Sequence, residues 1–537
     1  MGRVLPSALA IATAPPALAP ALALAVSALG IEITPAVAGA ILVVSATAGV
    51  GLAVALHRSL PAPPPGTPRH RGAIVAATSA VVLVTVLMLM HTAGRPVLDW
   101  DGLYYHVPAV HGWWHAGGIA WLEHGPAVPF VNGYPMALES IGYLTARVLD
   151  SDRWLDAWNL VLWPTAALGL ALTARLWGAR PGFAALAAVS FLLVPGWMRG
   201  STVAYVDAGF AAATCALVAA TVWRLQRNDH VASALLWGFA AGLVASTKGT
   251  GLLISGLAFG LVLVDVARRQ PRQRRSAARA LVIGTVVWLA LGAPWPARAV
   301  LHTGNPIHPV ELRIGAKVIH PGIDAHAAAD LALPASLESL PAPVRPLAVW
   351  ARPFAPVRAH DEPQGLGPLW TLGALPALIA LGWTRRRRWD VVGPVLLLAL
   401  GLLAQPAPWW SRLTLWVLAV GLPAAAVGAD RLVARWRVRG IAVTFAVIAA
   451  AAFVSVRAVH DDLVAPHAPT ATEHWFAELT DHPRWDAFLA APAIGHLGWS
   501  RDGTLLGGAL GHPLDARRVV HVADPTAVPT GVDWIVQ

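Results

Sequence analysis

The chain has 537 residues, of which 56% are hydrophobic and only 13% are charged. A soluble protein carries about twice that charged fraction, and apolar runs of membrane-spanning length recur along most of the sequence, so an ordinary soluble protein is excluded. The net charge is +10, but nearly all of the cations are arginines in short loops, which indicates membrane topology rather than nucleic-acid binding. Cys215 is the only cysteine in these residues, which leaves no intrachain disulfide and no cysteine-based metal site.

The sequence predicts an all-α polytopic membrane protein, because the backbone inside a bilayer must satisfy its hydrogen bonds within helices. Apolar windows indicate about thirteen transmembrane helices. The first window is expected to be a retained helix rather than a signal peptide, since no charged flank with a small-residue cleavage site follows it. The windows are residues 5–27, 32–57, 72–91, 154–177, 182–198, 206–225, 232–247, 250–267, 279–297, 367–384, 390–406, 411–430 and 440–457.

Arginine-rich loops predict the orientation of these helices. Loops such as "RLWGAR" (175–180) and "TRRRRWD" (384–390) follow alternate spans and therefore share one face, which the positive-inside rule makes cytoplasmic. The N-terminus is then cytoplasmic. The large loops 92–153 and 298–366, and the residues after about 457, are then extracytoplasmic.

The sequence changes character after the last apolar window. Short β-branched runs, "RVVHVA" (518–523) and "DWIVQ" (533–537), stand between glycine and proline turns. We therefore divide the chain into a transmembrane domain, 1–457, and a small extracytoplasmic α/β domain, 458–537.

Polar chemistry is concentrated in "LDWDGLYYHVPAVHGWW" (98–114), directly after an apolar run. Asp99 and Asp101 could act as general bases, bind a hard cation, or simply cap a helix or face solvent. Asp101 and Tyr105 would share a helical face if a helix begins here. His111 and His115 are four residues apart, as in some zinc sites. Because no third ligand follows at a fitting spacing, a polar helix face is favoured and no metal ligand is assigned.

This stretch resembles the first outer loop of GT-C superfamily glycosyltransferases, which carry a pattern close to W-D-x-L-x-Y-H-L-P, then an aromatic helix, a Tyr-Pro element and a Glu. Here the pattern falls on 100–108, Tyr134-Pro135 and Glu139, with Val107 where Leu is usual. Similar elements follow in the family's order. They are "AYVDAGFAA" (204–212), "ASTKGTGLL" (245–253), "TGNPIHPV" (303–310), "QGLGPLW" (364–370) and "SRLTLWVLAVGLP" (411–423).

The resemblance covers roughly residues 95 to 537. It departs from the family's pattern at Leu413, where a tyrosine is usual after the arginine. It implies a membrane enzyme that transfers a sugar from a polyprenyl-phosphate donor to a glycan, lipid or protein acceptor, with inversion. Some GT-C members use a divalent cation such as Mg²⁺ or Mn²⁺ near the first-loop Asp and others do not. Whether this chain uses a divalent cation therefore stays open.

Such a transfer needs a base for the acceptor hydroxyl and cations for the departing phosphate. Asp101 is predicted to be the base, with Asp99 and Glu139 as supporting carboxylates. Lys248 and Arg412 are predicted to bind the phosphate, because a cation at a helix end near lipid is costly and functional by default. The alternatives are a structural ion pair of Lys248 with Asp207 and an interfacial position for Arg412.

Further residues are expected to contact the substrate: Tyr105, His106, Tyr134, Asp207 and His308. His308 could instead stabilise a turn, and Asp207 could face the cavity or pair with Lys248. The outer tryptophans could stack on sugar rings, but an ordinary aromatic belt is favoured. These tryptophans are Trp113, Trp114, Trp121, Trp409 and Trp410.

Two other functions compete with the enzyme. A transporter or flippase of lipid-linked sugars predicts ionisable residues near mid-membrane in two related halves, whereas the polar residues here gather on one face. A non-catalytic envelope assembly protein would not need Asp101, Lys248 and Arg412 to converge. A separation of more than about 15 Å between them would favour that function, since catalytic groups must reach one substrate.

Overall fold

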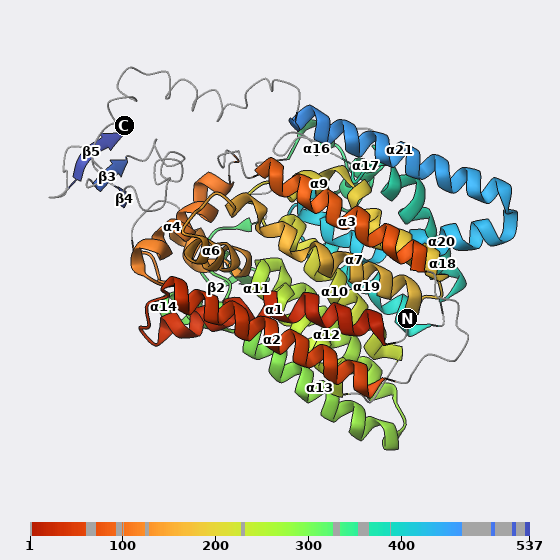
Figure 1. The fold of residues 1–537 in the computed structure, drawn as a ribbon, viewed down its shortest axis with the longest axis horizontal. Helices are drawn as coiled ribbons and strands as arrows, with labels where there is room; N and C mark the ends of the chain where they lie inside the picture. Colours follow the sequence, from red (N-terminus) through yellow and green to blue (C-terminus); the bar gives the residue numbers. More distant parts are fainter. Residues whose placement is uncertain are drawn as a thin grey trace.

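The computed structural model of the protein is a bundle of helices (Figure 1). It describes residues 3–60, 71–92, 99, 101–123, 128–226, 231–325, 333–352, 365–386, 388–463, 496–499, 518–521 and 532–536. Trp100, the first residue of the Trp-Asp motif, lies outside the described residues.

Within the described ranges, nine helical segments are long and apolar enough to cross a membrane. They are α1 (Val4–Ala28), α2 (Pro35–Ser59), α3 (Arg71–Thr92), η2 with α7 (Leu155–Leu162 and Trp163–Leu176), α10 (Asp207–Gln226), α12 (Gly249–Arg268), α13 (Pro271–Gly292), η6 with α20 (Ser411–Val417 and Leu418–Trp436) and α21 (Val438–Leu463). The chain is thus a multi-pass membrane protein.

Four shorter apolar helical segments occupy the remaining predicted windows. They are α8 with η3 (Pro181–Val189 and Ser190–Leu193), α11 (Val231–Thr247), η5 with α18 (Leu369–Ala374 and Leu375–Thr384) and α19 (Trp389–Ala404). A full crossing takes about 20 residues at 1.5 Å each, which these four do not reach. The number of thirteen crossings therefore stays a prediction.

Helix α10 is the centre of the bundle. Its apolar window is 100% buried, against 6% for α3 and 11% for α21, which lie at the periphery. It packs on α7, α11, η6, α12, α19 and α20. Small side chains allow this crowding, as is usual where membrane helices meet without a hydrophobic driving force. At Gly169 of α7, an added Cβ would lie 2.6 Å from the backbone carbonyl of Cys215 in α10.

Two structured regions correspond to the predicted large outer loops. The first contains the π-helix η1 (Gly102–His106), α4 (Val107–Ala116), α5 (Val128–Gly133) and α6 (Ala137–Leu149). The second, after α14 (Pro294–Thr303), contains an antiparallel hairpin of β1 (Leu312–Ile314) and β2 (Lys317–His320), followed by α16 (Ala335–Glu338), η4 (Ala342–Val344) and α17 (Arg345–Trp350). The short α9 (Pro195–Gly200) precedes α10.

Two predicted boundaries differ from the structure. The window 279–297 was placed too late, because α13 already begins at Pro271 and includes the arginine-rich segment. Proline suits a first helical turn and arginine is a good helix former, but neither tendency contributes to a hydropathy score. The arginine-rich segment "DRLVARWRVRG" (430–440), which joins the last two predicted windows, is also helical except for a break at Arg437, whose φ is 42°.

The C-terminal region contains the expected strands. β3 (His496–Trp499), β4 (Arg518–His521) and β5 (Val532–Val536) form a parallel sheet in the order β4-β3-β5. β4 and β5 coincide with the two β-branched runs in the sequence. The domain boundary at 457 and the extracytoplasmic position of this region stay predictions.

Candidate active site

Four charged side chains, all predicted site residues, form one continuous chain of ion pairs. Arg412 Nη1 donates to Asp101 Oδ2 at 2.7 Å and lies 3.6 Å from Asp207 Oδ2. Lys248 Nζ donates to the other oxygen of Asp207. The signs alternate along Asp101, Arg412, Asp207 and Lys248, so each charge is compensated by its neighbour. The structure therefore brings together residues that lie far apart in the sequence.

Each of the four residues stands at the end of a helical element. Asp101 immediately precedes the π-helix η1, and Asp207 is the first residue of α10, where a carboxylate complements the helix dipole. Lys248 is the extended residue, with φ −155° and ψ 150°, that separates α11 from α12. Arg412 lies in the 3₁₀ turn η6. Lys248 and Arg412 come close to Asp207 because α11, α12 and η6 pack against α10, and Arg412 in turn pairs with Asp101.

Two aromatic rings hold the Arg412 guanidinium. Its Cζ lies 4.6 Å from the ring centre of Tyr205 and 4.8 Å from that of Trp410. A guanidinium stacked on aromatic faces keeps its charge and its planar donor geometry. Arg412 is thus oriented by its surroundings and does not snorkel freely at the membrane interface. Trp410, predicted as a belt or sugar-stacking residue, makes this contact.

Two tyrosines from the first loop flank the ion pairs. Tyr105 and Tyr134 meet edge to face, with ring centres 5.8 Å apart. Burial, and then the nearby charge of Asp101, raise the pKa of Tyr134 to about 12 and that of Tyr105 well above its usual value. Both phenols therefore stay protonated and can donate hydrogen bonds to an oxygen beside Asp101.

Both carboxylate oxygens of Asp99 accept hydrogen bonds from the backbone. Its Oδ1 accepts from the Gly102 N–H at 2.8 Å and its Oδ2 accepts from the Ala204 N–H at 3.1 Å. Burial raises the pKa of Asp99 to about 6, against the lowering effect of these two donors. The contacts tie the first loop to the segment before α10. The structure therefore gives Asp99 a positioning place beside Asp101.

His106 and Glu139 form a buried pair beneath the first loop. His106 Nδ1 lies 2.6 Å from Glu139 Oε1, and the side chains are only 3% and 1% exposed. The pair joins η1 to α6. At this depth both side chains are shielded from solvent, and their predicted catalytic and binding roles stay predictions.

His308 lies against the turn that carries Tyr134. A Cβ added to Gly133 would stand 2.3 Å from the His308 carbonyl oxygen and 2.7 Å from its ring. The loop 303–310 thus closes on the end of α5, which only a glycine permits. Burial lowers the pKa of His308, which favours its neutral ring at neutral pH.

Several aromatic and histidine predictions are wrong. Trp113 and Trp409 are 0% and 3% exposed, so they are core residues and neither a belt nor a sugar platform. His111 is buried, with Nε2 3.7 Å from Asp152, and does not lie on a polar face. When a loop tryptophan stands beside polar residues, the local sequence does not indicate how deeply its ring is buried.

Comparisons with known proteins identify the fold. Chains of two solved structures match with TM-score 0.50. One is ArnT from Cupriavidus metallidurans in the apo state, 15% identical, covering 85% of this chain and 86% of that one. The other is the Archaeoglobus fulgidus oligosaccharyltransferase in complex with Zn and sulfate, 14% identical, covering 84% of this chain and 62% of that one. The chain has the GT-C fold.

The remaining comparisons add no further assignment. The same ArnT, bound to undecaprenyl phosphate, matches at 15% identity and TM-score 0.49, covering 84% of this chain and 90% of that one. No family model matches the sequence. No curated protein matches it either.

Sequence reasoning missed two residues, Asn159 and Tyr205, that build the site in this GT-C fold. Asn159 Oδ1 accepts from the Gly209 N–H at 2.9 Å, and its Nδ2 donates to the Tyr205 carbonyl at 2.6 Å. Asn159 thereby fixes the segment that presents Tyr205 to Arg412. An asparagine within the apolar run of a predicted span was the available signal, because polar groups inside a membrane are costly.

The carboxylates of this GT-C fold do not fit a divalent cation as they stand. In the described part of the chain, no group of three or more His, Cys, Asp or Glu side chains converges. Asp101 and Asp207 are bridged by a guanidinium, and each Asp99 oxygen accepts a backbone N–H. A hard cation needs several free oxygen ligands, which this set does not provide.

The site combines a partly exposed carboxylate, Asp101, with two cations that are held in ion pairs. The Asp101 side chain is 18% exposed and that of Asp207 is 6% exposed, so Asp101 is the carboxylate that an incoming molecule reaches first. Arg412 and Lys248 are 19% and 22% exposed. A proton acceptor beside two cations suits attack by a hydroxyl group with an anionic leaving group.

Proposed function

We propose that the protein is a membrane glycosyltransferase that moves a sugar from a polyprenyl phosphate to a hydroxyl of a glycan, lipid or protein outside the cytoplasmic membrane. The observation that carries this proposal is the ion-pair chain from Asp101 through Arg412 to Lys248. The GT-C fold supports it as the architecture of other membrane glycosyltransferases.

The proposed reaction is a single displacement. The oxygen of the acceptor hydroxyl attacks the anomeric carbon while Asp101 takes the hydroxyl proton. The bond from that carbon to the phosphate oxygen breaks. Arg412 and Lys248 stabilise the charge that develops on the departing phosphate. The proton resides on Asp101 and the electron pair on the phosphate. Inversion at the anomeric carbon follows from attack opposite the leaving group.

Phosphate binding requires the ion pairs to rearrange. Each cation now faces a carboxylate, and a phosphate that enters would compete with Asp101 and Asp207 for them. Loss of its Arg412 contact makes Asp101 more basic, because the neighbouring cation no longer stabilises its charged form. Donor binding would thus prepare the base for the acceptor.

The alternative functions have less support. The convergence of the charged groups is the opposite of the separation of more than about 15 Å expected for an assembly protein. A transporter would favour ionisable groups midway along its helices in two related halves, whereas Asp207 and Lys248 stand at helix ends. The extracytoplasmic position of the site rests on the arginine distribution.

The test uses membranes that contain the full chain and a panel of labelled polyprenyl-phosphate sugars. We expect wild type to consume one donor and Asp101→Asn to be slower by about 10²–10⁴-fold, the usual contribution of a general base. Asp150→Asn is a matched control, because Asp150 is exposed on the same loop. The proposal fails if no donor is consumed or if Asp101→Asn matches wild type.

A further inference from the structure

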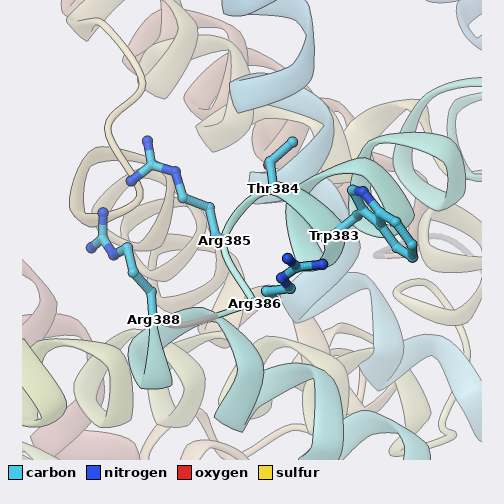
Figure 2. A pocket seen from close by; sticks show the side chains of 5 residues that line it. All are labelled: Trp383, Thr384, Arg385, Arg386 and Arg388. Carbon is cyan, nitrogen blue, oxygen red and sulfur yellow. The ribbon is translucent and has the colours of Figure 1, made fainter.

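A basic hollow lies at the turn between α18 and α19 (Figure 2). The figure shows the Arg385 and Arg388 side chains extending to the same side of the turn, while Arg386 turns toward Trp383. The hollow is lined by Trp383, Thr384, Arg385, Arg386 and Arg388.

The hollow and the candidate active site lie at opposite ends of the same helices. Asp207 begins α10, and Gln226 ends it and donates through Nε2 to Asp390 at 2.7 Å, at the start of α19. The 20 residues of α10 span about 30 Å. Likewise Lys248 precedes α12, whereas Arg268 at its other end lies over Trp389. The hollow therefore faces the other side of the membrane.

The hollow holds more positive charge than its neighbours neutralise. Arg388 Nη2 donates to Asp390 at 2.5 Å, which compensates that one arginine. Among the described residues, neither Arg385 nor Arg386 pairs with a carboxylate. A further guanidinium reaches the rim, since Arg431 Nη1 lies 3.4 Å from Thr384 Oγ1. Two arginines are thus left to attract an anion.

Trp383 sets the depth of the hollow relative to the bilayer. It is the penultimate residue of α18 and is 75% exposed, with the Arg386 guanidinium 5.9 Å from its ring centre. A bare tryptophan at the end of an apolar helix is typical of the membrane interface, where its ring lies at the level of lipid headgroups. An anion that enters the hollow from the side would therefore come from a lipid.

We propose that this hollow binds the headgroup phosphate of an anionic phospholipid of the surrounding bilayer. Guanidinium groups donate two parallel hydrogen bonds to phosphate oxygens, and basic pockets at helix ends suit anionic headgroups. Because a free phosphate ion offers the same chemistry, the test must separate the two sources. The site does not depend on the proposed enzymatic activity.

The test reconstitutes the full chain in vesicles of equal parts phosphatidylcholine and phosphatidylglycerol and measures the retained lipid by native mass spectrometry after mild detergent extraction. We expect wild type to retain phosphatidylglycerol selectively. The double variant Arg385→Gln/Arg386→Gln should retain it at least about tenfold more weakly, which corresponds to one charge-assisted hydrogen bond.

The matched control is Arg272→Gln/Arg275→Gln. It removes the same charge from exposed positions at the start of α13, on the same predicted face, away from the hollow. Selective retention should survive in this control, and both variants should keep the thermal midpoint of wild type. Equal losses in the two variants, or no preference for phosphatidylglycerol in wild type, would overturn the proposal. Displacement of the lipid by millimolar inorganic phosphate would overturn the lipid as the source.

Discussion

Arg412 donates a hydrogen bond of 2.7 Å to Asp101 although 311 positions separate them in the chain. The contact joins the first outer loop to the turn before α20. It also orders the other charges, because Arg412 is the residue that links Asp101 to Asp207. The following predictions test what each member of the site contributes.

The first prediction is that Asp101 and Arg412 act as one unit. The losses of kcat/KM in Asp101→Asn and Arg412→Gln should not add in the double variant, and the interaction energy should be about 1–3 kcal/mol, as for residues in direct contact. The measurement is donor consumption in proteoliposomes. Asp265 and Arg269, an i,i+4 pair at the far end of α12, provide a comparison cycle with little effect on the rate. Additive losses at 101 and 412 would contradict the prediction.

Lys248 should matter chiefly for donor binding. Lys248→Gln removes a cation from the phosphate and should raise the KM for the donor about 10–100-fold, as expected for the loss of a charge-assisted hydrogen bond. Lys248→Arg keeps the charge and should recover part of the loss. If Lys248 only balances Asp207, Lys248→Gln will lower the unfolding midpoint and leave the KM unchanged.

Protonation of Asp99 should lower the reaction rate at acidic pH. Its pKa is raised to about 6, so the carboxylate becomes protonated as the pH falls through that value and then accepts its backbone hydrogen bonds less well. The rate of wild type should therefore fall below about pH 6, and this midpoint should be missing from the profile of Asp99→Asn. The check is the pH–rate profile of both proteins at saturating donor.

The same group also makes a stability prediction. Because the folded-state pKa is above the ordinary 3.8, the stability that Asp99 contributes is greatest below 3.8 and falls as the pH rises to about 6. Thermal unfolding of wild type relative to Asp99→Asn should follow this direction. An opposite slope would mean that the carboxylate is stabilised, not destabilised, in the folded protein.

Glu139 is predicted to stabilise the first loop. Glu139→Ala leaves the buried His106 ring without its partner and should lower the free energy of unfolding by about 1–3 kcal/mol. The donor KM of the surviving folded protein should stay near that of wild type. A lost rate with an unchanged unfolding midpoint would instead favour a catalytic role for Glu139.

Gly133 should be required for the contact between α5 and the loop 303–310. In Gly133→Ala the new Cβ would meet the His308 carbonyl, and relief of this overlap should cost about 1–3 kcal/mol. Gly256→Ala on α12 is the matched control, since nothing lies within 4 Å of its added Cβ. Thermal unfolding of both variants in detergent measures the difference.

The sequence predicted the membrane architecture and nominated most of the charged site residues. Apolar windows report burial in lipid directly, and a lysine or arginine stands out in an apolar chain because its cost there is large. Lys248 and Arg412 could be chosen in this way, and Asp101 by its place directly after an apolar run. Their pairing could not, because it depends on which helix ends meet around α10.

The depth at which side chains pack could not be predicted, and the reason is physical. Glu139 and His106 pair in the interior through Oε1 and Nδ1, and nothing in their local sequence distinguishes such a pair from residues that face a substrate. Trp113 looked like an interface residue, yet its ring is buried and its Nε1 donates to the Ala120 carbonyl at 3.2 Å. Burial is set by the neighbours that tertiary packing supplies, and local composition does not contain that information.

The distance along the chain between Asp101 and Arg412 also bears on how the protein is made. The first loop emerges from the ribosome long before the turn that carries its counter-ion, and Asp207 and Lys248 are synthesised in between. Until the span that starts at Ser411 has been inserted, Asp207 can pair with Lys248, but Asp101 lacks the Arg412 partner that it has in the complete fold. Under the proposed function, a chain that ends before residue 411 lacks the cation that pairs with Asp101 and should therefore be inactive.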